Sequence, residues 1–301
     1  MDAVLITMPD TLREFLIALT VVQELQIQMV HGALKDPPLR EKLFTITFRL
    51  NEKFKCFDPC LQVISSLVPT FDYSGWNEYT RGEFTNFIDF DFELAKRIAK
   101  PNQLHITEAF GAKLGTTYNA LHFNMYPGKQ PILTPLKLPA HSKTKVTIVE
   151  WDDTVKSGFK LAEFITNNYP ELVVKYWDSN ISVSDVETAC IWANDCDVFI
   201  GILSEYSFIA ASLEKALIEI FPTDEDCYLY HNKNLVHYAC TVGNPELAYV
   251  WYMWEEMWPD LSESISNTKS REQATLTAQQ VSIASNVEEK LLDNQDLPLG
   301  Q

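Results

Sequence analysis

The segment Asp197–Thr223, with the sequence DVFIGILSEYSFIAASLEKALIEIFPT, constrains the fold of this chain more than any other part. An apolar run is followed by a turn with two serines, a helical stretch and a second apolar run. This order predicts a strand, a helix and a second, parallel strand, because parallel strands need a crossover connection. A helix that begins directly after a strand presents backbone N–H groups at its N-terminus, where the helix dipole favours a phosphate.

The same alternation of strands and helices fills the second half of the chain. Before Ser204 the pattern predicts strands at Lys145–Trp151, Leu172–Trp177 and Asp197–Leu203, separated by helices at Thr154–Asn168 and Asp185–Asn194. After it come a helix at Tyr206–Lys215 and a strand at Ala216–Phe221, while Ser184 and Glu187 form a capping-box pattern. Such alternation is typical of a parallel sheet with helices on both faces, so the fold class is α/β.

The first half is expected to be α/β as well. A strand at Ala3–Met8 leads into a helix at Leu12–Leu25 that Asp10 or Thr11 caps. We predict further strands at Ile27–His31 and Phe84–Phe92, then helices at Glu93–Ala99 and Ile106–Leu114, and we leave Pro37–Tyr79 unassigned.

The chain length and a proline-rich passage indicate two domains. The 301 residues suit two cores of roughly 130 to 150 residues each. We predict domains at residues 1–126 and 145–259, joined by a connector at residues 127–144 that contains four prolines, and a polar tail at residues 260–301 that is helical or disordered. Three tryptophans at helical spacing, Trp251, Trp254 and Trp258, are expected to pack in a core rather than to bind a ligand.

The charge distribution, the cysteine spacing and the apolar runs limit the partners, metal sites and location that this chain is expected to have. Residues 1–150 hold 16 basic and 16 acidic residues, whereas residues 151–301 hold 8 and 25, so the net charge of −17 comes from the second half. A neutral first half with local basic clusters still permits a polyanionic partner. The six cysteines lack zinc-finger spacing and are expected to be reduced. Without a signal pattern or an apolar run of about 20 residues, we expect a soluble, cytoplasmic protein.

The order of elements and several short motifs resemble the GT-B glycosyltransferases, and specifically the heptosyltransferases of glycosyltransferase family 9. The resemblance covers about Leu5–Thr223. It places Ser204 on the serine of the family's phosphate turn, Ile220 and Phe221 on the end of the following strand, and Pro9-Asp10 on the turn after the first strand. It implies two Rossmann-like domains that face a cleft, followed here by a C-terminal helical extension. Three positions depart from the family pattern, with Leu203 for aspartate, Glu205 for glycine and Phe208 for histidine.

The resemblance also implies the roles of the candidate site residues. Asp10 is the expected catalytic base, although the same residue is equally suited to cap its helix, and Arg13 is expected to pair with Asp10 or to contact the acceptor. Donor binding is expected at the start of the second domain and at the serine turn, through Trp151, Asp152, Ser204, Glu205 and Ser207. Ordinary helix capping explains Asp152 and Ser204 as well. Glu205 would repel a diphosphate unless it turns to solvent or meets a ribose hydroxyl.

The resemblance implies a metal-independent, inverting transfer of a sugar from a nucleotide diphosphate to an acceptor hydroxyl. The expected acceptor is a saccharide or a hydroxymethylated base in phage DNA. We expect neither a metal nor a cofactor, because Asp89-Phe90-Asp91 fits solvent-facing acids of a half-buried strand better than a DxD metal site. The alternative function is a catalytically inactive, GT-B-like nucleotide-binding or regulatory protein. The sequence does not indicate an oligomeric state.

Overall fold

The computed structural model describes most of the helices and strands of the chain. The described residues are 2–35, 44–62, 69–73, 84–117, 131–133, 136, 138, 144–178, 185–221, 238–242, 250–263 and 266–267. The chain divides into two compact units, Met1–Met253 and Trp254–Gln301. Both β-sheets lie in the first unit.

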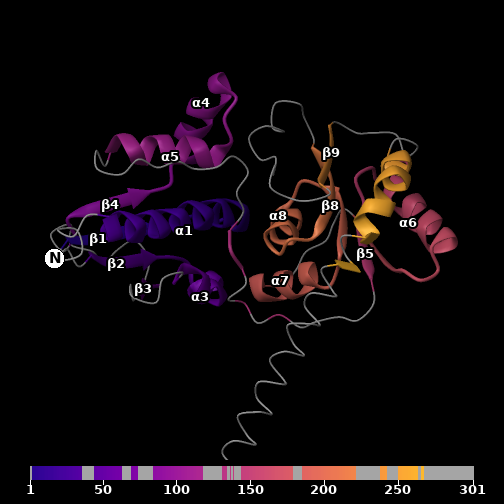
Figure 1. Cartoon of the computed structure of the whole chain (residues 1–301), viewed down its shortest axis with the longest axis horizontal. Helices are drawn as coiled ribbons and strands as arrows, with labels where there is room; N and C mark the ends of the chain where they lie inside the picture. Colours follow the sequence, from indigo (N-terminus) through magenta and orange to yellow (C-terminus); the bar gives the residue numbers. More distant parts are fainter. Residues whose placement is uncertain are drawn as a thin grey trace, which may run out of the picture. The chain divides into compact units, whose positions relative to one another are not determined.

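The first sheet has four parallel strands in the order β3-β2-β1-β4 (Figure 1). Its strands are β1 (Asp2–Thr7), β2 (Phe44–Arg49), β3 (Thr70–Asp72) and β4 (Asn86–Asp89). The sequence predicted β1 within one residue at each end and predicted β4 as a longer strand. Strands β2 and β3 lie in the stretch that we had left unassigned.

Helix α1 (Leu12–Lys35) follows β1 and is longer than predicted. The Thr11 hydroxyl accepts a hydrogen bond from Glu14 N at 3.4 Å and donates one to the Glu14 carboxylate at 3.0 Å, so Thr11 caps the helix. The predicted strand at Ile27–His31 is wrong, because these residues continue α1. No glycine or proline lies between Leu25 and His31, and the Gln26 side chain donates a hydrogen bond to Leu61 O at 2.7 Å, which anchors this part of the helix.

Short helices complete the first half. They are η1 (Glu52–Phe57), α3 (Asp58–Leu61), α4 (Phe92–Asn102) and α5 (Ile106–Thr117). The predicted helices at Glu93–Ala99 and Ile106–Leu114 are confirmed, each with a few additional residues. Asp91 caps α4 by accepting a hydrogen bond from Leu94 N at 2.9 Å. Most of the predicted connector at residues 127–144 lies outside the described residues.

The second sheet has five parallel strands in the order β6-β5-β7-β8-β9. Its strands are β5 (Lys145–Val149), β6 (Val173–Trp177), β7 (Val198–Ile202), β8 (Ala216–Phe221) and β9 (Tyr238–Val242). The first four match the predicted strands closely, and β9 was not predicted. The α/β class with two parallel sheets is therefore confirmed.

Helices cover both faces of this sheet. Helix α6 (Ser157–Asn168) packs on β5 and β6, while α7 (Val186–Asn194) packs on α8 (Glu205–Ser212), which in turn packs on β7 and β8. Figure 1 shows α6 on one side of the strands and α7 and α8 on the other. Asp185, not the predicted capping-box pair, caps α7 by accepting a hydrogen bond from Thr188 N at 2.8 Å. Ser184 lies outside the described residues.

The tryptophan stripe behaves as packing residues in both units. In the first unit the Trp251 ring lies against Phe164, with centroids 3.7 Å apart. In the second unit Trp254 is fully buried and stacks on Trp258 at 4.8 Å. Residues 250–263 are helical, whereas residues 268–301, where we predicted most of the tail, lie outside the described part.

One hydrophobic cluster of the first unit reaches from the first sheet to α7, α8 and Phe221 of β8. The cluster that contains Phe15 of α1 and Phe48 of β2 also contains Val186 of α7 and Phe208 of α8. Helix α1 packs directly on α8, and η1 packs on α7. The core therefore runs from one sheet to the other through these helices.

Candidate functional site

Each sheet reverses its strand order at one point, and the predicted site residues gather there. In the first sheet β1 is followed by β2 on one side, while β4 lies on the other. In the second sheet β5 is followed by β6 on one side, while β7 lies on the other. In open parallel sheets, ligands bind beyond the carboxyl ends of the two strands that flank such a reversal. The turn after β1 holds Asp10, the turn after β5 holds Trp151 and Asp152, and the turn after β7 holds Ser204.

Asp10 lies in the turn after β1 with an exposed side chain. Thr11 caps α1, so the capping role that competed with catalysis belongs to the neighbouring residue. The Asp10 carboxylate makes no hydrogen bond or ion pair with any residue that the structure describes. Within the described part of the chain, Asp10 is therefore a carboxylate without a bonding partner, at the carboxyl edge of a parallel sheet.

Arg13 connects the start of α1 to the start of α8. Its guanidinium lies over the ring of Phe208, 5.6 Å from the centroid, in the geometry of a cation–π contact. Phe208 is the fourth residue of α8 and is only 4% exposed. The contact holds a positive charge near the first turn of α8 and joins the start of α1 to the start of α8.

Ser204 and Ser207 form a reciprocal capping box at the head of α8. Ser204 N donates to Ser207 Oγ at 3.0 Å, and Ser207 N donates to Ser204 Oγ at 3.4 Å. Ser207 is fully buried and its hydroxyl also donates to Ser204 O at 2.9 Å, so this side chain shapes the turn from inside. Glu205, the first residue of α8, is exposed.

In the turn after β5, the Asp152 side chain is hydrogen-bonded to the backbone, whereas the Trp151 side chain is buried. Asp152 Oδ1 accepts hydrogen bonds from Thr154 N at 3.0 Å and from Val155 N at 3.2 Å, which is an Asx-type turn. Trp151 is 8% exposed, and its buried indole N–H has no hydrogen-bond partner among the described residues. A buried donor of this kind is unusual in a folded protein.

Glu150 is the residue that the sequence interpretation missed. It directly follows β5, is completely buried, and its carboxylate accepts hydrogen bonds from the N–H groups of Trp151, Asp152, Gly158 and Phe159 and from the Tyr176 hydroxyl. Burial, followed by this hydrogen bond, raises the pKa of Tyr176 to about 12. A glutamate inside a predicted buried strand was a visible signal, because a buried carboxylate needs several donors.

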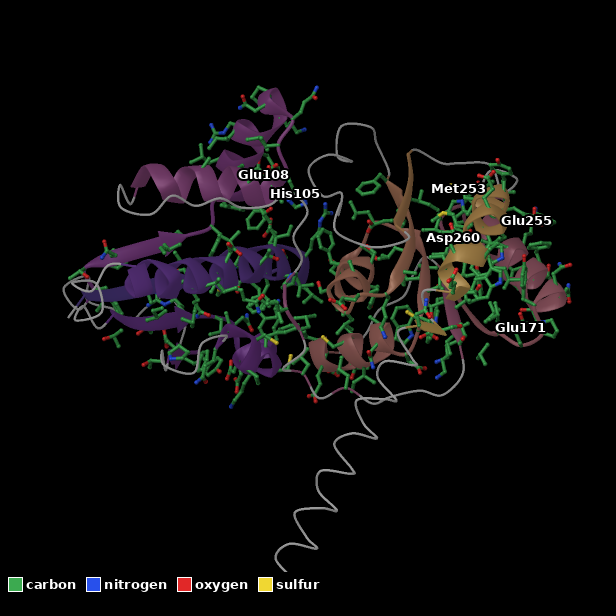
Figure 2. All side chains as sticks on the ribbon, viewed as in Figure 1. His105, Glu108, Glu171, Met253, Glu255 and Asp260 are labelled. Atoms are coloured by element: carbon green, nitrogen blue, oxygen red, sulfur yellow. The ribbon has the colours of Figure 1, made fainter. Side chains whose placement is uncertain are left out.

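The Asp89-Phe90-Asp91 motif does not belong to a metal centre in the described part of the chain. No group of three or more His, Cys, Asp or Glu side chains there could hold a metal ion. Asp89 is exposed at the end of β4, whereas Asp91 caps α4. His105 and Glu108 lie together at the head of α5 (Figure 2), where Glu108 accepts a hydrogen bond from His105 N at 2.8 Å and His105 Nδ1 lies 2.7 Å from Thr107 Oγ1.

Within the described residues, no helix is both long enough and apolar enough to span a bilayer.

Comparisons with known proteins give structural likenesses alone. No protein-family model matches the chain, and no curated protein sequence matches it. Among solved structures, it matches the E. coli heptosyltransferase WaaC with ADP at 11% identity and a TM-score of 0.45, over 85% of this chain and 99% of that one. The chain is similar to heptosyltransferases.

Two further structures are similar over most of their length. A glycosyltransferase of family 9 from Veillonella parvula matches at 9% identity and a TM-score of 0.49, over 87% of this chain and 97% of that one. The E. coli ADP-heptose heptosyltransferase II matches at 8% identity and a TM-score of 0.45, over 88% and 99%.

Proposed function

We propose that this chain is a nucleotide-sugar glycosyltransferase that moves a sugar from a nucleotide diphosphate to an acceptor hydroxyl. The observation that carries the proposal is Asp10, a carboxylate with no structural partner among the described residues at the point where the first sheet reverses its strand order. The contact between Arg13 and Phe208 supports it further, because it joins the start of α1 to the start of α8.

In the proposed reaction Asp10 takes the proton from the acceptor hydroxyl as that oxygen attacks the anomeric carbon. The bond from this carbon to the diphosphate oxygen breaks, and the nucleoside diphosphate leaves with the electron pair. Attack and departure on opposite faces of the sugar invert the anomeric centre. Negative charge on the leaving diphosphate is stabilised by the dipole of α8 and by Arg13, without a metal ion.

Within this proposal the donor residues have different tasks. Ser204 and the first turn of α8 receive the diphosphate, while Ser207 keeps that turn in shape. Trp151 and Asp152 face the nucleoside from the turn after β5. The acceptor is a saccharide or a hydroxymethylated base in DNA, and salt-sensitive binding of duplex DNA would favour the second.

The test compares Asp10→Asn with Asp89→Asn, a matched variant that removes an exposed carboxylate at the same edge of the sheet. Each protein is incubated with nucleotide sugars and with both kinds of acceptor, and the products are measured by mass spectrometry. Asp10→Asn should lose roughly 100- to 10,000-fold in kcat, the usual contribution of a general base. It should still bind ADP, the nucleotide in the similar E. coli structure. Asp89→Asn should retain activity.

A second candidate is a nucleotide-binding protein without transfer activity, and the capping box at α8 favours it. Both serines of that turn already satisfy each other. Wild-type protein that binds nucleoside diphosphates but transfers no sugar to any acceptor would support this function and exclude the first.

A further inference from the structure

Glu150 is an ionisable residue in the interior, at the end of β5. Its own N–H donates to Trp177 O at 2.9 Å and extends the pairing between β5 and β6 by one residue. The side chain is 0% exposed. Burying a carboxylate is very unfavourable unless hydrogen-bond donors surround it, so the surroundings of this group need an explanation.

Five donors converge on the two oxygens of this carboxylate. Oε1 accepts from Trp151 N at 3.1 Å, Asp152 N at 3.0 Å and Gly158 N at 2.9 Å, while Oε2 accepts from Phe159 N at 3.1 Å and Tyr176 Oη at 2.9 Å. Gly158 and Phe159 are the second and third residues of α6. Glu150 therefore occupies the place that a bound anion takes at a helix N-terminus.

Gly158 shows how closely the helix approaches this carboxylate. A Cβ atom at residue 158 would lie 3.1 Å from Glu150 Cα and 3.3 Å from Glu150 Cδ and Oε1. Contacts this short force a shift of the neighbouring atoms, and here the neighbour includes backbone. The absence of a side chain at residue 158 allows the head of α6 to close over Glu150.

We propose that Glu150 is a positioning residue that serves as a built-in anion at the head of α6. Its carboxylate occupies the α6 amides and fixes the backbone of Trp151 and Asp152, so that the turn after β5 is already formed when a nucleotide binds. The diphosphate is thereby directed to α8 instead of α6. This inference rests on the proposed function, because Trp151 and Asp152 are taken to face the nucleoside.

A purely structural cap would leave a different signature. Loss of such a cap lowers the stability of the protein but leaves the affinity of the folded protein for a nucleotide unchanged. Loss of a positioning residue lowers both the stability of the protein and its affinity for the nucleotide. A small carboxylate such as formate, which has the shape of the missing group, should restore both when Glu150 is truncated.

The experiment uses the full chain with Glu150→Gln, Glu150→Ala and Gly158→Ala, and Asp185→Ala as the matched control. Asp185 also caps a helix through a backbone N–H, at the head of α7, and makes no hydrogen bond to Glu150 in the described structure. Unfolding temperature is measured by calorimetry, and the Kd values for ADP and UDP by titration calorimetry, each with and without formate. Gly158→Ala displaces Glu150 while keeping its charge, and provides a second route if Glu150→Ala does not fold.

We expect both Glu150 variants and Gly158→Ala to weaken binding of the preferred nucleotide by at least about tenfold, the loss of one charge-assisted hydrogen bond. Asp185→Ala should lower the unfolding temperature and leave the Kd within about twofold. Formate should raise both the unfolding temperature and the affinity of Glu150→Ala, and have no such effect on wild type.

A wild-type Kd in the folded Glu150 variants would overturn the inference, and so would tighter binding, which would mean that the freed head of α6 takes the phosphate. If wild-type protein binds neither nucleotide, the proposed function fails separately. Stabilisation of Glu150→Ala by formate then still supports the built-in anion, and its absence overturns it.

Discussion

At the scale of single residues, Asp195, which directly follows α7, shows how an ion-paired carboxylate connects two strands. Its carboxylate forms ion pairs with Lys145 at the start of β5 and Lys175 in the middle of β6, and so ties these two strands to the loop before β7. Burial by itself would raise the pKa of Asp195, but the hydrogen bonds from the two lysines lower it below its ordinary value.

A depressed pKa makes the stability of this region depend on pH in a defined direction. The stabilisation is present above the ordinary aspartate pKa of about 3.9 and is lost as the pH falls through the lower pKa of the folded state. Asp195→Asn should destabilise the protein by about 0.5–1 kcal/mol at pH 7, since all three side chains are partly exposed, and should show a shallower loss of stability in acid. Urea unfolding at pH 7 and pH 3 measures both effects.

The control for this prediction is Glu93→Gln, which breaks the exposed pair with Lys96. That pair joins two residues of α4 three positions apart, so its loss should change the free energy of unfolding by no more than about 0.5 kcal/mol. Equal effects of the two substitutions would contradict the structural importance of Asp195.

Single residues also show where sequence reasoning stops. The sequence identified Asp10 and Thr11 as rival caps of α1, and the hydrogen bonds of the structure assign the cap to Thr11. Glu150 escaped notice because its role depends on donors from Gly158, Phe159 and Tyr176, which only the folded chain brings together. Spacing along a sequence cannot show such convergence.

At the scale of elements, α8 carries the phosphate hypothesis and offers a test of it. Its cap is Ser204, and aspartate caps helices as well as serine does. Ser204→Asp should therefore retain the unfolding temperature of the wild type, whereas Ser204→Ala should cost about 1 kcal/mol. If a diphosphate lies at this helix head, the added carboxylate should weaken ADP binding by at least about tenfold through charge repulsion. Unchanged ADP affinity in Ser204→Asp would place the phosphate elsewhere.

Elements were predictable from sequence where apolar runs and breakers are distinct. Strand β8 was predicted with the bounds that the structure shows, because it lies between a lysine and a proline. The false strand at Ile27–His31 came from a short apolar run of ambiguous periodicity inside α1. Strands β2, β3 and β9 each lack a predicted helix directly before or directly after them in the sequence. The alternation of strands and helices that predicted the other strands was therefore missing there.

At the scale of the whole molecule, the shared core predicts how the first unit unfolds. Phe208 of α8 packs in the same cluster as Phe15 of α1 and Phe48 of β2, and it is also the ring beneath Arg13. The sequence predicted two domains joined by a connector, a division that would allow separate unfolding. A core that runs through α1 and α8 favours a single cooperative transition instead.

Phe208→Ala tests this because it removes a large buried side chain at the point where the two halves of the core meet. Its cost should be about 3–5 kcal/mol. Native-state hydrogen exchange of amides in β1 and α7 should then show a similar loss of protection, since both elements contribute residues to the cluster that contains Phe208. Phe199→Leu is the matched control: Phe199 is buried in the separate cluster of the second sheet. A loss of protection confined to α7 in Phe208→Ala would mean that the two sides of this cluster unfold independently, as separate domains would.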